Sequence, residues 1–313
     1  MNKGNTRFAE EGLMDGYDLI ILGAGPAGIQ AGIHATRRGV RVLVLGKRSE
    51  SAVLKGHFEN YAFIEGPVTG GELLDIGERQ LQKFGAVILA EDAVDLSRTG
   101  EGFAVRVESG RELPARAVIL ATGTARKKLG IPGERELEGR GVSYCVDCDA
   151  GFFKKKRVVV TGDGSAAASG ALHMLHFTSD VTLVSDRMAI AGALDRELRS
   201  SKVKLVEGRK LSRIVGVETV TGVVLSDDIS LAADGVFIEK GAKGILELGS
   251  ELGLQLNEEG HLAVDRDMAT NVPGLFAAGD VTGPPWQMAK AVGEGCVAGL
   301  RAAEYIKRGG NTG

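Results

Sequence analysis

A glycine-rich turn near the start of the chain limits the fold more than any other feature. Residues 23–28 read Gly-Ala-Gly-Pro-Ala-Gly and follow a mainly apolar segment at 17–22, which predicts a buried strand. A helix is predicted from there to about Arg38, and residues 41–45 predict the next strand. This order is what a dinucleotide-binding βαβ unit requires, because the glycines let the backbone approach a pyrophosphate at the helix N-terminus. The alternative is a purely structural glycine turn.

A second copy of this pattern lies further along the chain. Residues 157–161 predict a strand with three central valines that leads into Gly-Asp-Gly-Ser-Ala-Ala at 162–167, and residues 181–184 predict the following strand. The distance from the first glycine to the first valine of the following strand is 19 residues in both copies, from 23 to 42 and from 162 to 181, which indicates two Rossmann-type units. Two more apolar runs, 117–123 and 275–280, each end in a turn of small residues and fit the first unit, and residues 293–307 predict a closing helix.

The order of these segments predicts the domain organisation. We predict an α/β fold with two Rossmann-like domains of three-layer ββα architecture, the second inserted into the first. Residues 1–126 and 244–313 form one domain, with 1–16 as a loose leader, and residues 127–243 form the insert. A chain of 313 residues is long enough for both domains to bury a core.

The composition excludes several classes of protein. Lys and Arg number 38 against 41 Asp and Glu, a near balance that argues against nucleic acid as a partner. No stretch approaches the ~20 predominantly apolar residues of a bilayer helix, and residues 1–16 lack the apolar core of a secretory signal. Three cysteines do not form a disulfide framework, so we expect a cytoplasmic protein.

A cysteine pair, Cys145 and Cys148, is the predicted chemical centre. The Cys-X-X-Cys spacing lets two thiols close a readily exchanged disulfide. A zinc site would need two more ligands, no second pair exists, and His173 and His176 are too close in sequence for a zinc finger. Inert buried thiols are the third possibility. Asp149 is the candidate general acid/base for the leaving thiolate; its alternative role is an exposed loop acid.

Together these motifs resemble the low-molecular-weight thioredoxin reductase family over nearly the whole chain. The resemblance rests on residues 23–28, 58–61, 121–124, 141–149 and 278–281, with Gln287 and Ala289 beyond them. It implies FAD in the split domain, a homodimer, and a rotation of the insert during turnover. It also implies that Cys148 faces the flavin, that Cys145 attacks the disulfide of a thioredoxin-like substrate, and that Asp149 carries the proton.

The predicted FAD site combines the glycine turn with the family positions. Asp280, after an apolar strand, is expected to accept hydrogen bonds from sugar or ribityl hydroxyls; a turn or helix-capping role is the alternative. The family's Gly-Gly-Gln-Leu segment is missing, and Gly46 stands near the usual ribose-binding acid, so Lys47 or Arg48 is a candidate for the adenosine end. The predicted FAD-binding residues are Gly23, Gly25, Pro26, Ala27, Gly28, Gly46, Lys47, Asn60, Ala93, Thr122, Gly123, Asp280, Gln287, Met288 and Ala289.

The insert departs from the family where NADPH would bind. The family's arginine-rich signature is replaced by Ser-Asp-Arg-Met-Ala-Ile-Ala at 185–191, where Arg187 alone survives beside Asp186. Asp163 lies in the second glycine loop, and Ala-Lys-Gly at 242–244 replaces Pro-Asn-Thr. We therefore expect that NADPH is not used. Asp186 could instead accept a ribose hydroxyl of NADH, or a nicotinamide cofactor binds in an unusual way.

The resemblance narrows to atypical branches that take electrons from reduced ferredoxin or a reduced deazaflavin. A basic run at 154–157 is a candidate docking site for ferredoxin or thioredoxin, although such runs are often solvated loop edges. Trp286 is expected over the flavin, at a partner surface or dimer interface, or in the core, and Cys296 is expected in the core.

Four functions stay open at this point. We favour a flavin-dependent thioredoxin reductase that does not use NADPH. A conventional NAD(P)H-dependent reductase is the first alternative. A dithiol oxidase is the second, against which Asp149 argues because relatives of that type carry His after the cysteine pair. The third is a non-enzymatic flavin redox sensor.

Overall fold

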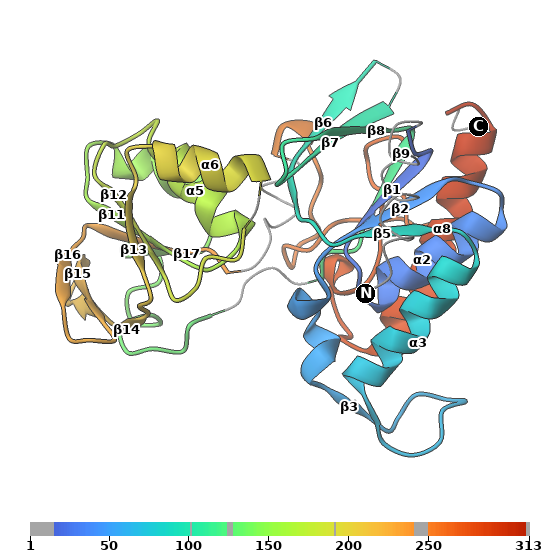
Figure 1. Cartoon of the computed structure of the whole chain (residues 1–313), viewed down its shortest axis with the longest axis horizontal. Helices are drawn as coiled ribbons and strands as arrows, with labels where there is room; N and C mark the ends of the chain where they lie inside the picture. The colour runs from blue at the N-terminus through green and yellow to red at the C-terminus, as the bar shows by residue number, and fades with distance from the viewer. Residues whose placement is uncertain (1–15, 101, 124–127, 191, 241–249, 311–313) are drawn as a thin grey trace. The chain divides into compact units, whose positions relative to one another are not determined.

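The computed structural model describes residues 16–100, 102–123, 128–190, 192–240 and 250–310. The chain divides into two compact units (Figure 1). The first comprises Met1–Val107, Arg111–Thr124 and Gly249–Gly313, and the second comprises Glu108–Gly110 and Ala125–Leu248. The predicted domain boundaries fall within or beside segments 124–127 and 241–249, and nearly all of the predicted leader at 1–16 likewise lies outside the described residues.

The first unit is built on a parallel five-stranded sheet. Its strand order is β18-β9-β1-β2-β5, so the two predicted late strands, β9 and β18, follow one another on the same side of β1. The register aligns Leu19 of β1 with Val42 of β2 and with Ala117 of β9. The strands are β1 (Leu19–Leu22), β2 (Val42–Leu45), β5 (Val87–Leu89), β9 (Ala117–Leu120) and β18 (Leu275–Ala277). The sheet's central strands are continuous apolar runs because helices or other layers cover both faces.

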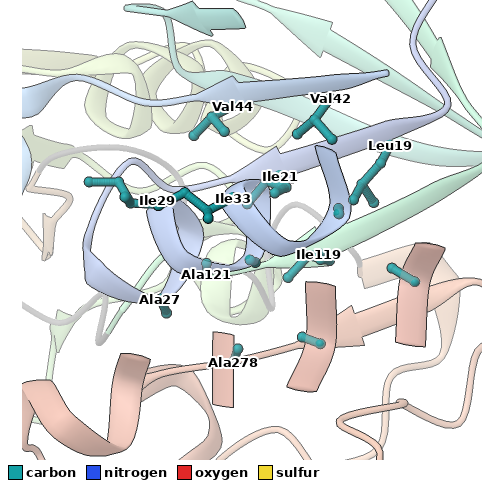
Figure 2. Packing of buried hydrophobic residues seen from close by; sticks show 14 of the residues in the cluster. Leu19, Ile21, Ala27, Ile29, Ile33, Val42, Val44, Ile119, Ala121 and Ala278 are labelled. Atoms are coloured by element: carbon teal, nitrogen blue, oxygen red, sulfur yellow. The ribbon is translucent and has the colours of Figure 1, made fainter. Parts of the chain in front are cut away.

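Three helices accompany this sheet: α2 (Pro26–Arg37), α3 (Gly70–Lys83) and α8 (Met288–Lys307). Figure 2 shows Ile29 and Ile33 of α2 packed beside Ile21 and Val44 of the sheet. Helix α8 approaches α2 closely, because Gly295 has no side chain to keep the two backbones apart. The closing helix, predicted to begin at 293, begins at Met288, and both Gly293 and Gly295 lie inside it.

Smaller elements complete the first unit. An antiparallel sheet has the order β6-β7-β8, and a two-stranded hairpin pairs β3 with β4. These strands are β3 (His57–Phe58), β4 (Val68–Thr69), β6 (Ala93–Thr99), β7 (Gly102–Val107) and β8 (Glu112–Ala115). Short 3₁₀ turns occupy Arg48–Glu50, Ala52–Lys55, Ser250–Leu252 and Asp280–Thr282.

The second unit repeats the plan of the first. Its parallel sheet has the order β10-β17-β11-β12-β13, and an antiparallel sheet, β14-β15-β16, accompanies it. The strands are β10 (Val142–Ser143), β11 (Val158–Thr161), β12 (Val181–Ser185), β13 (Lys204–Glu207), β14 (Leu211–Gly216), β15 (Val220–Leu225), β16 (Ser230–Ala232) and β17 (Gly235–Ile238). The helices are α4 (Val146–Asp149), α5 (Ser165–Met174) and α6 (Gly192–Ser200), with a 3₁₀ turn at Ala150–Phe153. The predicted α/β class with two Rossmann-like units is confirmed.

Parallel strands place all their carboxyl ends at one edge of a sheet, and open α/β sheets bind ligands outside that edge. Each unit therefore has one edge at which to look for a site. In the part of the chain that is described, no helix is long and apolar enough to cross a membrane.

Candidate active site

The first glycine turn joins β1 to α2 and has one open side. A side chain at Gly23 would place its Cβ 2.1 Å from the Ala121 carbonyl oxygen, and one at Gly28 would lie 1.8 Å from the Gly23 carbonyl oxygen. These two glycines close the turn against neighbouring backbone. At Gly25 the nearest atom to such a Cβ is the Ser51 hydroxyl at 3.8 Å. The turn thus leaves space at Gly25, where a pyrophosphate could approach the backbone.

Helix α2 begins beside that space without a polar cap. Pro26 occupies its first turn, Gly25 is the N-cap, and no side chain accepts a hydrogen bond from the first N–H groups. No acidic side chain lies in the first turn. The N–H groups and the positive end of the helix dipole are therefore available to an anionic ligand.

Two polar groups stand at the neighbouring strand ends. The Thr122 hydroxyl, after β9, is buried and has no hydrogen-bond partner among the described residues. Burial raises the pKa of Asp280, after β18, and Glu294 adds to that, while Lys290 opposes it. Buried polar groups normally find partners, so this pair fits a polar ligand at the edge of the sheet. Gly279 has φ +86°, and a Cβ there would lie 3.0 Å from Cβ of Ala27, which brings the Asp280 turn against the glycine turn.

Lys290 fixes the turn that carries Asp280. Its Nζ donates to the carbonyl oxygens of Gly279 and Gly283 at 2.8 and 2.7 Å and to the Thr282 hydroxyl at 2.7 Å. Its carboxylate partner is Glu294, at 3.1 Å. The turn is held by α8, so Asp280 is presented from a rigid support.

Other predicted FAD residues are also brought together within this unit. Asn60 Nδ2 donates to Gln287 Oε1 at 3.4 Å, although 227 positions separate them. Gln287 is the N-cap of α8, and the predicted Met288 and Ala289 form the first residues of that helix. Gly123 has φ +72°, a conformation that favours glycine.

The segment after β2 packs on the glycine turn. Gly46 has φ +150°, and a Cβ there would lie 2.8 Å from the Ala24 backbone nitrogen. Lys47 Nζ lies 3.3 Å from a carboxylate oxygen of Asp92, a buried residue that directly precedes Ala93. The predicted positions 46, 47 and 93 therefore lie close to one another.

Arg48, the other candidate for the adenosine end, is engaged elsewhere. Its guanidinium pairs with Asp75 and Glu78 of α3 at 2.7 and 3.2 Å. It also donates to the Gly71 carbonyl oxygen at 2.7 Å. These contacts tie the segment after β2 to α3.

These features fit a flavin dinucleotide in the first unit. The open glycine turn suits its pyrophosphate, and the orphaned Thr122 hydroxyl and the Asp280 carboxyl suit its polar groups. Bound FAD would supply a carrier that accepts one or two electrons.

The second unit carries the cysteine segment at the end of β10. Cys145 is disulfide-bonded and 7% exposed, whereas Cys296 is free. Ser143 Oγ donates to Asp149 Oδ2 at 2.7 Å and accepts from the Cys145 backbone N–H at 3.1 Å. Asp149 is thus linked to the backbone of Cys145 through one hydroxyl group. Positions 147 and 148 belong to α4, but their side chains lie outside the described residues.

Asp163 of the second glycine loop turns toward the end of β12. Its Oδ1 accepts from the Ser185 hydroxyl at 2.8 Å and from the backbone N–H groups of Asp186 and Arg187 at 2.9 and 3.4 Å. Asp186 pairs with Lys210 at 3.0 Å, and the pKa of Lys210 is raised by its hydrogen bond with Asp186, by their attraction and, less, by Asp163. These contacts tie the second glycine loop to the end of β12 and to Lys210.

Sequence reasoning missed a further carboxylate, Glu239, which directly follows β17. Glu239 is 5% exposed, and its Oε1 accepts from the Val146 backbone N–H at 2.8 Å. Its only sequence signal is an acid placed directly after a buried strand.

Several other expectations have clear outcomes. Trp286 is 58% exposed and packs edge-on against His261, at 6.4 Å between ring centroids, which rules out the core among its predicted positions. Cys296 lies only partly buried on α8. The rings of His173 and His176 lie 5.7 Å apart. No group of three or more potential metal ligands occurs in the described residues.

The basic run at 154–157 lies exposed after the cysteine segment. Phe152 beside it is 75% exposed, and the Lys156 ammonium lies 5.3 Å from the Phe153 ring centroid. Arg157 binds Asp234 at 2.6 Å, and this hydrogen bond lowers the pKa of Asp234 to about 2.

Comparison with known proteins identifies the family. Residues 17–295 match the family described as pyridine nucleotide-disulphide oxidoreductase. The thioredoxin reductase of Bacillus subtilis is 35% identical over 307 residues, covering 93% of this chain and 95% of the relative. That of Listeria innocua is 34% identical, covering 93% and 94%.

Two solved structures are also similar. The atypical thioredoxin reductase of Desulfovibrio vulgaris Hildenborough is 37% identical with a TM-score of 0.76, covering 93% of this chain and 98% of that one. The ferredoxin-flavin thioredoxin reductase of Clostridium acetobutylicum is 34% identical with a TM-score of 0.65 and the same coverage. The chain therefore belongs to the thioredoxin reductase family of the pyridine nucleotide-disulphide oxidoreductases, and is a flavin disulfide reductase of that type.

Proposed function

We propose that this chain passes electrons from FAD through a Cys145–Cys148 disulfide to a thioredoxin-like protein, and that its electron donor is ferredoxin or a similar carrier, not NADPH. The observation that carries the proposal is the carboxyl edge of the second sheet. It bears the Cys145 disulfide after β10 and a carboxylate after each of the next three strands, Glu239, Asp163 and Asp186.

The pairing follows from the cysteine inventory. The chain has three cysteines, Cys145 is disulfide-bonded and Cys296 is free, which supports Cys148 as the partner. In the reduced state, the Cys145 thiolate attacks a sulfur of the substrate disulfide and forms a mixed disulfide. The Cys148 thiolate then attacks Cys145 and releases the substrate as a dithiol.

Asp149 handles the protons in this exchange. It holds a hydrogen bond from Ser143, whose hydroxyl also accepts from the Cys145 N–H. Unlike Cys145, Asp149 is partly exposed, so it can exchange protons with water. We assign it as the acid that protonates the leaving thiolate and as the base that removes a proton from the thiol.

The identity of the electron donor is inferred from the charges at the carboxyl edge of the second sheet. A nicotinamide dinucleotide brings phosphates to the carboxyl edge, where Asp163 and Asp186 stand. A like-charge contact at about 4 Å costs roughly 4 kcal/mol at an effective dielectric constant near 20. Of the arginine-rich signature at 185–191 only Arg187 remains, beside Asp186, and Lys210 is paired with Asp186. The similar clostridial protein is named for its ferredoxin dependence, which supports the same kind of donor here.

The proposal assigns FAD to the predicted residues of the first unit, with the pyrophosphate at Gly25 and the polar groups of the isoalloxazine and ribityl chain near Asp280 and Gln287. A homodimer, a cytoplasmic location and docking of an acidic protein on the 154–157 run belong to the same proposal. The basic run favours acidic partners because opposite charges steer their encounter.

Single-turnover reduction of a thioredoxin tests the thiol relay without any assumption about the donor. The protein is reduced with dithionite, desalted anaerobically and mixed with oxidised thioredoxin, and new thiols on the thioredoxin are counted. We expect Cys145→Ser and Cys148→Ser each to abolish this transfer. The matched control is Cys296→Ser, which removes the free cysteine and should transfer as the wild type does. Full transfer by Cys145→Ser would contradict the proposal.

A further inference from the structure

Glu239 and Cys145 occupy equivalent positions on neighbouring strands. β10 pairs with β17 in parallel, with Ser143 opposite Phe237. Continuing that register by two residues on each strand brings Cys145 beside Glu239. The carboxylate therefore reaches the cysteine segment from the adjacent strand end, and not from the cysteine loop itself.

The backbone and the packing both fix Glu239 in place. Its backbone N–H donates to the Thr161 carbonyl oxygen at 2.9 Å, which extends the pairing of β17 with β11. A Cβ at Gly162 would lie 1.8 Å from the Glu239 carbonyl oxygen, and one at Gly170 of α5 would lie 3.5 Å from Glu239 Cγ. Gly162 thus makes room for the Glu239 backbone, and α5 packs on its almost fully buried side chain.

The side chain is directed to the first turn of α4. Glu239 Oε1 accepts from the Val146 N–H at 2.8 Å, and Val146 is 1% exposed. Free N–H groups at the start of a helical turn stabilise a preceding cysteine as its thiolate. Here the N–H that directly follows Cys145 is taken by a carboxylate instead.

We propose that Glu239 is a positioning residue of the dithiol centre, whose buried charge and contact with Val146 oppose a thiolate at Cys145 and make the pair more strongly reducing. The inference rests on the proposed thiol relay. Reduction of the disulfide takes up two electrons and two protons to give two thiols, and the substrate disulfide later receives both. A neighbour that destabilises the thiolate removes one source of stability from the reduced state, so the pair gives up its electrons more readily.

Glu239 and Asp149 have different roles beside the cysteine pair. Asp149 is partly exposed, which suits proton exchange with water, and the Ser143 hydroxyl joins it to the backbone of Cys145. Glu239 is buried and bound to the Val146 backbone N–H, which holds its carboxylate in one place. A low potential would let electrons from the flavin continue to substrates that are themselves hard to reduce.

The test is a redox equilibrium of the full-length flavoprotein at neutral pH. The protein is equilibrated with mixtures of reduced and oxidised dithiothreitol, trapped by alkylation, and the oxidised fraction is measured by mass spectrometry. Glu239→Gln keeps an oxygen acceptor for Val146 and removes the charge. We expect its equilibrium to shift about tenfold toward the reduced pair, which corresponds to about 30 mV for two electrons. Alkylation of Cys145 by iodoacetamide should become about tenfold faster.

Glu207→Gln is the matched control. It makes the same chemical change at the end of β13, on the opposite side of the sheet from β10, and should leave both readouts within twofold of the wild type. Glu239→Asp keeps the charge and should also stay within about threefold. An equilibrium for Glu239→Gln within twofold of the wild type would overturn the inference. If Glu239→Gln does not purify, Glu239→Asp provides the test. A tenfold shift of its redox equilibrium would overturn the inference, because a variant that keeps the carboxylate should keep the equilibrium of the wild type.

The same titration separates this inference from the proposed function. A wild-type protein in which dithiothreitol does not reversibly open a disulfide of Cys145 would contradict the thiol relay itself. A wild type that titrates normally, with an unshifted Glu239→Gln variant, contradicts only the role given to Glu239.

Discussion

Gly293 and Gly295 lie on the same helix, α8, but a side chain at each would meet different surroundings. Gly295→Ala would place a Cβ 2.2 Å from the Ala27 carbonyl oxygen of α2, whereas ordinary contact begins near 3.4 Å. The obstacle is backbone, so α2 and α8 must separate by on the order of 1 Å. Overpacking costs typically 1–3 kcal/mol, and for a backbone clash we take about 3 kcal/mol.

Gly293→Ala is the matched control on the same helix. A Cβ at Gly293 meets nothing within 4 Å. Replacing a helical glycine by alanine stabilises by about 1 kcal/mol through helix propensity. The same gain partly offsets the clash at Gly295, so Gly295→Ala should destabilise the first unit by about 2 kcal/mol and Gly293→Ala should stabilise it by about 1 kcal/mol.

Thermal unfolding of the first unit can be measured by the rise in flavin fluorescence when the unit releases its FAD. One kcal/mol corresponds to roughly 2–4 °C in Tm for a unit of this size. We expect Tm to fall by about 4–8 °C in Gly295→Ala and to rise by about 2–4 °C in Gly293→Ala. Equal Tm values for the two variants would refute the reasoning, because both make the same chemical change.

Three further predictions concern single polar side chains. Asp149→Asn should slow steady-state thioredoxin reduction about 100-fold, within the usual range for loss of a general acid, without changing the bound flavin; an unchanged rate would exclude the proton role. Lys290→Met should weaken FAD binding about tenfold in fluorescence titrations, since the turn before Asp280 loses its three Lys290 hydrogen bonds; unchanged affinity would contradict this support. Burial raises the pKa of Glu134, but hydrogen bonds from the Leu129, Gly130 and Ile131 N–H groups and the Tyr144 hydroxyl outweigh it and lower the pKa below its ordinary value. The stabilisation by Glu134 should therefore be present at neutral pH and be lost as the pH falls through the ordinary glutamate pKa toward the lower folded value, so the stability difference between wild type and Glu134→Gln in urea should shrink in acid.

The sequence predicted those parts of the fold that depend on local pattern. Both glycine turns and the strands beside them were located because buried parallel strands are continuous apolar runs. The start of α8 was placed too late, because Gly293 and Gly295 suggest a break to any local rule. Gly295 is explained only by its contact with α2, which is distant in sequence.

The candidate sites were predicted less completely. Asp163 was identified as an acid in the wrong place for a phosphate, yet its bond to Ser185 depends on how two strand ends meet. Glu239 was overlooked because nothing beside it in the chain is chemically unusual; only the pairing of β17 with β10 gives it a neighbour. Arg48 was a candidate for binding adenosine until the structure showed its two carboxylate partners on α3.

The most direct test of the central claim is an anaerobic titration of the purified flavoprotein, in which reduction is followed by loss of the visible flavin absorbance. NADPH is added first, then NADH, then photoreduced ferredoxin together with oxidised thioredoxin. We predict no bleaching by either nicotinamide, and thiol formation on thioredoxin once ferredoxin is present. Prompt bleaching by NADPH or NADH would contradict the account, because the acidic edge of the second sheet would then bind the cofactor that it is proposed to exclude.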